Sequence, residues 1–115
     1  FMHRVGIGYT LHFNKKYKRT GSLFGSRFKS AYVHANNFIY LSAYVNCNAE
    51  VHGLVRAEDY KWCSFPDYIG TRNGKLCAQE VILDQFQSRR DYQNFAKENA
   101  AAMKEKKEFE KMLME

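Results

Sequence analysis

The chain has 115 residues, of which 45% are hydrophobic, and a formal net charge of +6, which fits one domain or part of a larger one. A single Pro and seven Gly argue against a low-complexity chain, and no apolar run approaches the roughly 18 residues that a membrane span requires. The three cysteines lack a C-x-x-C spacing, which argues against a zinc site and favours reduced thiols in the cytoplasm.

The positive charge is confined to the first half of the chain. Residues 1–49 contain seven Lys or Arg and no acid, whereas residues 50–115 contain eleven bases and twelve acids, so the two parts carry +7 and −1. This division favours a nucleic-acid partner over a merely solvated basic surface. The cations that we expect to contact the nucleic acid are Lys15, Lys16, Lys18, Arg19, Arg27 and Lys29.

Residues 1–17 predict a helix, because apolar side chains recur near helical spacing, and Gly21 after the basic run is a typical stop. Residues 27–33 alternate basic with aromatic or apolar side chains, which predicts a strand. Cations interleaved with rings also suit single-stranded nucleic acid, because cations follow phosphates while rings stack on bases. For Phe24 and Phe28, however, a place in the core is the favoured interpretation.

Residues 37–48 predict a helix capped by Asn36 or Asn37. The side expected to face the core carries Phe38, Leu41, Ser42 and Val45. A row at the edge of that side, spaced i, i+4, i+8, consists of Tyr40, Tyr44 and Asn48. Such an edge can hold a reactive group by packing and still leave it accessible, although a tyrosine there is more often structural.

The second half predicts short elements followed by one long helix. Residues 57–70 indicate short helices or turns, residues 71–75 a turn, and residues 76–86 either a helix or a strand. Ser88 and Asp91 resemble a capping box that opens the long, charged C-terminal helix.

Four sequence blocks, taken together and in their order along the chain, are specific enough to indicate a protein family. They are FNKKYKRTGSLF at 13–24, SRFKS at 26–30, YLSAYVNCNAEVHG at 40–53 and EDYKWCSFPDYIG at 58–70. In this order they resemble the REP-associated tyrosine transposases and their single-tyrosine HUH relatives, and the resemblance extends over roughly residues 1–110.

These transposases nick and rejoin single-stranded DNA, and the resemblance implies roles for Tyr44 and Asn48. Tyr44 matches the catalytic nucleophile, which attacks a backbone phosphate and gives a 5′-phosphotyrosine with a free 3′-hydroxyl. Asn48 matches the third ligand of a divalent metal, Mg²⁺ or Mn²⁺, which polarises the scissile phosphate.

The resemblance also implies an α+β fold, with residues 1–87 as part of a ferredoxin-like HUH transposase domain and residues 88–115 as a charged helical tail. We expect this part to be mostly helical with one or few strands, and to expose an apolar face. The implied partners are single-stranded or hairpin DNA and, in dimeric members, a second copy. The implied location is the cytoplasm of a prokaryote, at the nucleoid, with no membrane association.

Two departures limit the resemblance. Ala49 stands where the family has a Pro. The His-hydrophobic-His pair that supplies the other two metal ligands is absent, since the histidines lie at positions 3, 12, 34 and 52, where we expect surface or packing roles. We therefore expect the C-terminal half of a transposase, starting at Phe1 rather than Met, with an incomplete metal site and little nicking activity alone.

Two other interpretations stay open. A non-catalytic remnant would keep the basic half and bind nucleic acid without forming a covalent adduct. A protein-interaction fragment, held by the charged C-terminal helix, would show DNA binding that is absent or insensitive to salt.

Overall fold

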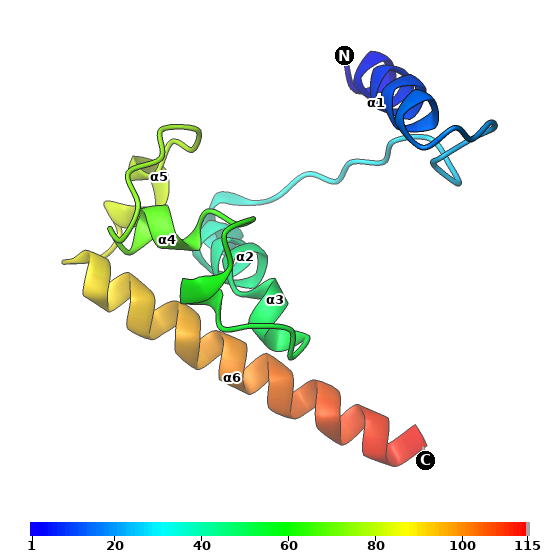
Figure 1. Ribbon diagram of the computed structural model, residues 1–115. Coiled ribbons are helices and arrows are strands. Elements are labelled where there is room, and N and C mark those ends of the chain that lie inside the picture. Colours follow the sequence, from blue (N-terminus) through cyan, green and yellow to red (C-terminus); the bar gives the residue numbers. More distant parts are fainter. Residues whose placement is uncertain (115) are drawn as a thin grey trace. The chain divides into compact units, whose positions relative to one another are not determined.

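Helices joined by coil make up residues 1–114, the part of the chain that this computed structural model describes (Figure 1). The elements, with η marking 3-10 helices, are α1 (Met2–Lys16), η1 (Ala35–Asn37), α2 (Phe38–Asn46), α3 (Asn48–Val51), η2 (Ala57–Asp59), α4 (Phe65–Tyr68), α5 (Glu80–Leu83) and α6 (Arg89–Met114). The short helices predicted within 57–70 are η2 and α4, and residues 76–86 contain α5. The residues cluster into two units, Phe1–Tyr32 and a second from Val33 onward.

No β-strand forms within residues 1–114, so the expected α+β, ferredoxin-like fold is wrong and the described chain is mainly α. Residues 27–33, where alternation predicted a strand, are coil. A strand needs a neighbouring strand to pair its amides and carbonyls, and no described segment supplies one here. Phe24 and Phe28, for which the core was favoured, are instead 54% and 61% exposed.

α1 confirms the helix predicted at the start of the chain, but it ends earlier than expected. Lys18 adopts a left-handed conformation with φ of 52°, and the Arg19 amide donates to the Asn14 carbonyl at 2.9 Å, which closes the last turn. Gly21, the expected stop, lies in the loop beyond this closure. No residue of α1 is buried.

The core of the second unit forms where α6 lies along α2 and α3 (Figure 1). Tyr92 of α6 is fully buried, and three rings surround it: Phe65 at 6.3 Å, Tyr68 at 5.2 Å and Phe86 at 5.4 Å between centroids. Aromatic groups of this size account for much of the apolar area that a small helical unit can bury.

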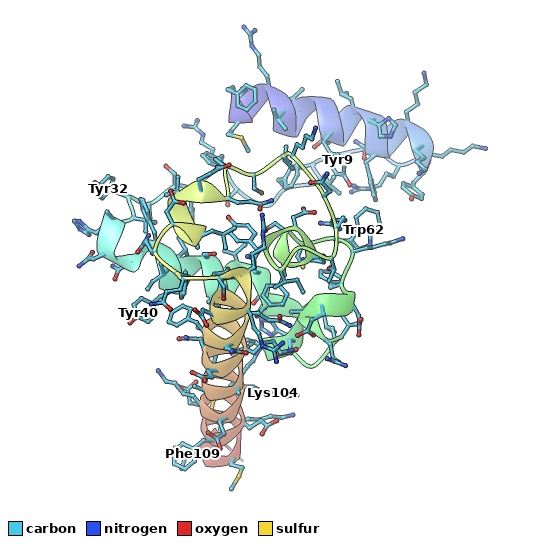
Figure 2. All side chains as sticks on the ribbon, turned by 90° about the vertical axis from the view of Figure 1, so that its left-hand side faces the viewer. Tyr9, Tyr32, Tyr40, Trp62, Lys104 and Phe109 are labelled. Carbon is cyan, nitrogen blue, oxygen red and sulfur yellow. The ribbon has the colours of Figure 1, made fainter. Side chains whose placement is uncertain are left out.

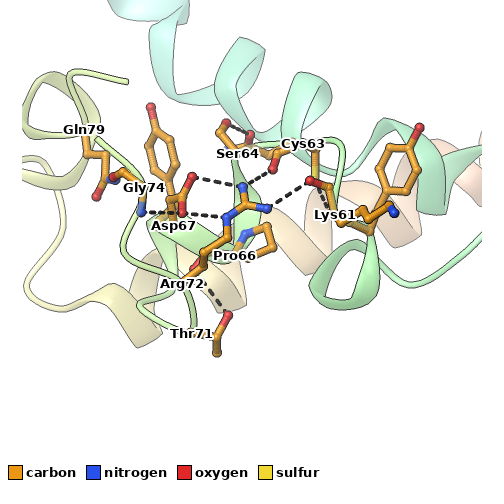
Figure 3. A network of polar contacts seen from close by, with 12 residues as sticks. Lys61, Cys63, Ser64, Pro66, Asp67, Thr71, Arg72, Gly74 and Gln79 are labelled. Carbon is orange, nitrogen blue, oxygen red and sulfur yellow. Dashed lines mark hydrogen bonds and ion pairs between the residues drawn. The ribbon is translucent and has the colours of Figure 1, made fainter. Parts of the chain in front are cut away.

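A polar network fixes the chain after α4 (Figure 3). The Asp67 carboxylate accepts hydrogen bonds from Arg72 Nε at 2.8 Å, from Arg72 Nη2 at 3.0 Å and from the Gly74 amide at 2.9 Å. Arg72 also donates to the carbonyls of Lys61 and Cys63, at 2.9 and 2.6 Å. The bond from Arg72 holds the pKa of Asp67 below its usual range. A Cβ on Gly74 would lie 2.6 Å from the Asp67 carboxylate, so a larger residue there would displace the carboxylate from its bonds with Arg72.

α6 begins as predicted, because the Ser88 hydroxyl accepts a hydrogen bond from the Asp91 amide at 3.2 Å. Its buried side chains end at Ala100, Met103 is half-buried, and the side chains from there to Met114 are exposed. α6 is also the longest described helix, and no helix within residues 1–114 combines the length and apolar character that a membrane crossing needs.

Candidate functional site

α2 presents Tyr44 on its exposed side. The helix buries Ala43 and Asn46, and Cys47, which directly follows it, is also buried. Tyr44 lies between these buried positions and is 45% exposed. One turn earlier lies Tyr40, which Figure 2 labels. It is 52% exposed, and its ring lies 5.4 Å from that of Phe95 in α6.

The core-facing side of α2 differs from the predicted one. Phe38 and Ser42 are partly buried, as expected, whereas Leu41 and Val45 are 41% and 58% exposed. The small side chain of Ala43 faces the cluster that contains the buried alanines of α6. Small residues let two helices approach closely, and periodicity cannot reveal this in a helix that is apolar on most sides.

A buried hydrogen-bond network fixes the rotation of α2. The hydroxyls of Tyr92 and Ser42 lie 2.5 Å apart, and Asn46 Nδ2 donates to the Tyr92 hydroxyl at 2.9 Å. Asn46 Oδ1 in turn accepts from the Ser64 hydroxyl. Burial raises the pKa of Tyr92, so this phenol stays neutral and structural. This network was not predicted from the sequence, where the available signal was Ser42 and Asn46, two polar residues four apart in an apolar helix.

Asn48 lies in α3, beyond a local break at Cys47 with φ of −106° and ψ of 12°. The predicted helix over 37–48 is therefore confirmed for Phe38–Asn46 only, and the predicted row of Tyr40, Tyr44 and Asn48 is divided between two helices. The Asn48 Oδ1 atom is buried and has no hydrogen-bond partner in the described part of the chain. An unpaired buried oxygen is unfavourable, and an amide oxygen is a suitable ligand for a hard cation.

The described donors do not by themselves make a metal site. Within residues 1–114 no group of three or more His, Cys, Asp or Glu side chains is arranged to hold an ion. The buried, unpaired Asn48 Oδ1 is a suitable oxygen ligand for Mg²⁺ or Mn²⁺. The neighbouring Cys47 thiol is unsuited, because burial, with the charge of Glu50, raises its pKa to about 12.

The acids nearest to α3 are already engaged with a lysine of α6. Lys97 pairs with Glu50 and lies 2.9 Å from Glu58 Oε1, and Glu50 Oε1 also accepts from the Ala57 amide at 3.2 Å. Burial opposes the charge on Lys97, but hydrogen bonds to both carboxylates raise its pKa overall. Burial by itself would raise the pKa of Glu58, but the hydrogen bond from Lys97 outweighs it, so the pKa of Glu58 is lowered overall. These groups tie α3 and η2 to α6.

The six cations predicted to contact DNA all lie in the first unit. Two end α1, two follow in its closing turn and two lie in the coil: Lys15, Lys16, Lys18, Arg19, Arg27 and Lys29. Five are exposed, and Arg19 is half-buried with its guanidinium 5.6 Å from the centre of the Phe13 ring. Tyr44 and Asn48 belong to the second unit, so the two groups of predicted site residues lie in different units.

The four histidines at positions 3, 12, 34 and 52 are exposed, which confirms the surface role expected for them.

Comparison of the chain with protein-family models, with curated proteins and with solved structures finds no match.

Proposed function

We propose that this chain supplies the nucleophile for nicking and rejoining single-stranded DNA, as single-tyrosine transposases do, at the nucleoid of a prokaryote. The observation that supports this most is the setting of Tyr44. Its ring is exposed, while the opposite side of α2 is fixed by the bonds of Ser42 and Asn46 to Tyr92. A nucleophile has to be both accessible and held in one orientation.

In this proposal the Tyr44 hydroxyl oxygen attacks a backbone phosphorus. A bond between phosphorus and the tyrosine oxygen forms and the bond to the 3′-oxygen breaks, leaving a 5′-phosphotyrosine. The phenol loses its proton to solvent and the departing 3′-oxygen gains one. Attack by a 3′-hydroxyl on the phosphotyrosine reverses these changes, joins the strand and restores the phenol.

A divalent cation, when bound, would supply polarisation of the phosphate. The unpaired Asn48 Oδ1 would provide one oxygen ligand. The paired histidines that would complete such a site are missing, because none of the four histidines lie two residues apart. We therefore propose little nicking by these 115 residues alone.

A trapped adduct tests the role of Tyr44. A single strand with sulfur at the 3′-bridging position releases a thiol that rejoins poorly, so a covalent intermediate accumulates. With Mg²⁺ or Mn²⁺, protein expressed from the full natural reading frame should form an adduct that mass spectrometry maps to Tyr44. Tyr44→Phe should abolish the adduct, while Tyr40→Phe, at another exposed tyrosine of α2, should retain it.

Three results would count against parts of this proposal. No adduct from the full reading frame, or an adduct that persists in Tyr44→Phe, removes the catalytic role. Metal-dependent cleavage by the 115-residue chain alone removes the expectation of an incomplete site.

The second candidate is a nucleic-acid-binding protein without catalysis. It is favoured by the division of charge, with +7 in residues 1–49, and by the lack of the paired histidines. Both candidates predict DNA binding that weakens with salt, so the adduct assay separates them.

A further inference from the structure

A groove of about 830 Å³ lies between α1 and the coil that follows it, within the first unit. One wall is formed by Met2, Val5 and Tyr9 of α1, and the other by Phe24 and Phe28. The Tyr9 and Phe24 ring centres are 6.3 Å apart. The groove is therefore lined by aromatic and aliphatic side chains that no described residue covers.

Phe24 packs against α1 at Gly6. A Cβ built there would lie 3.9 Å from the Phe24 ring, which is ordinary van der Waals contact, so one edge of this ring rests against α1. Phe24 and Phe28 are 54% and 61% exposed, which leaves two large apolar rings in contact with water. At roughly 25 cal/mol per Å², covering such rings is favourable, so an occupant with apolar faces gains from binding there.

The charge around the groove restricts the occupant. Residues 1–32 carry all seven Lys or Arg of the basic half and no acid, and Arg27 and Lys29 line the groove itself on either side of Phe28. A second copy that docked through its own residues 1–32 would bring the same +7 and be repelled. An anionic partner is therefore favoured.

A lipid surface fits less well than a nucleic acid. A helix that lies on a membrane separates its apolar and polar residues onto two faces. In α1 the exposed apolar residues Val5, Ile7, Tyr9 and Leu11 follow one another at every second position, so they lie around the helix and not on one face. A concave site with rings and cations suits flat bases joined by phosphates.

We propose that this groove binds unpaired bases of a single-stranded nucleic acid. The bases stack against Tyr9, Phe24 and Phe28, and Arg27 and Lys29 bind the flanking phosphates. This inference rests on the proposed function for the choice of DNA as the strand, and it names the part of the chain that would hold the substrate.

Binding to two strands of equal charge tests the stacking. The full chain is titrated into a labelled 12-mer of deoxythymidine and into an abasic 12-mer, with fluorescence anisotropy as the readout. Phe24→Leu and Phe28→Leu should each weaken binding of the thymidine strand by roughly 5- to 150-fold, the range for loss of one stacked base. Binding of the abasic strand should not change.

Two control variants separate stacking from charge and from general damage. Lys29→Gln should weaken both strands alike and reduce the salt slope by about one. Phe109→Leu, at a ring that is 60% exposed on α6, should change neither strand. A measurement on the unmodified chain removes the dependence on variants that fold poorly: 5-iododeoxyuridine strands should photocrosslink to Tyr9, Phe24 or Phe28, as peptide mass mapping would show.

Several results would overturn the inference. The first two are equally weakened binding of both strands in the Phe variants, and crosslinks that lie outside the groove. The third is self-association that Phe24→Leu abolishes. The fourth is binding to anionic vesicles that Phe24→Leu reduces while binding to DNA is unchanged. The proposed function fails separately. An adduct at Tyr44 without base stacking rejects the groove, and base stacking without an adduct rejects the catalysis.

Discussion

Replacing Tyr92 by Phe would test whether the buried network holds α2 in place. Tyr92→Phe keeps the buried ring and removes the hydroxyl, which leaves Asn46 Nδ2 and the Ser42 hydroxyl without this partner. Asn46 is 3% exposed, so water cannot readily replace the bond. A buried polar group left unpaired costs about 1–3 kcal/mol, and the half-buried Ser42 should add less.

The measurement is the free energy of unfolding from urea titrations followed by circular dichroism at 222 nm. A loss of about 1–3 kcal/mol should lower the melting temperature by roughly 4–8 °C per kcal/mol in a unit of this size. The matched control is Tyr68→Phe. Its ring is also buried, but its hydroxyl has no hydrogen-bond partner in the described residues, so it should stay within about 0.5 kcal/mol of the unmodified chain.

A double variant decides whether the loss arises in the network. Asn46→Ala should destabilise the Tyr92→Phe background less than it destabilises the unmodified chain, because the shared hydrogen bond is already gone. Equal losses for Tyr92→Phe and Tyr68→Phe, or additive losses for Tyr92→Phe and Asn46→Ala, would refute this account of how α2 is held.

Three further predictions concern other parts of the second unit and α1. Gly74→Ala should lower the melting temperature because its Cβ meets the Asp67 carboxylate, whereas Gly8→Ala, with nothing within 4 Å, should stabilise helical α1 by about 0.5–1 kcal/mol. The pKa of Asp67 is lowered on folding, so the ionised carboxylate stabilises the fold above its unfolded pKa of about 4. This stabilisation is lost as pH falls through the lower folded pKa, so Asp67→Asn should make the melting temperature depend less on pH between pH 5 and 2. Because burial raises the pKa of Cys47 to about 12, maleimide at pH 8 should label exposed Cys77 rapidly and Cys47 only after unfolding, as peptide mapping would show.

The sequence predicts helices better than it predicts how they pack. The helix over 1–17 and the cap at Ser88 follow from local signals. Gly53, two residues beyond the end of α3 at Val51, has a φ of 71°, a left-handed conformation that favours glycine after a helix. The strand predicted over residues 27–33 does not form, because alternation describes a single segment, whereas a strand requires a second segment to pair with its backbone amides and carbonyls.

The setting of the candidate site was only partly accessible from the sequence. Spacing placed Tyr44 on a helix edge, which its exposure supports, but the side that faces the core depended on small residues such as Ala43. The partnership of Asn46 with Tyr92 joins positions 46 residues apart and leaves no local pattern. The same holds for Lys97, whose acidic partners lie 47 and 39 residues earlier.

The uneven support along α6 has a consequence for local opening. Its first half contributes the buried Tyr92, Ala96 and Ala100, whereas beyond Met103 the exposed side chains are tied back mainly through a contact of Lys107 with His52. Amide hydrogen exchange should therefore fall into two classes along one continuous helix: slow near Tyr92, where opening requires global unfolding, and fast toward Met114, where fraying suffices. One helix can thus serve as the main support of a folded unit and end in a segment that opens without disturbing it.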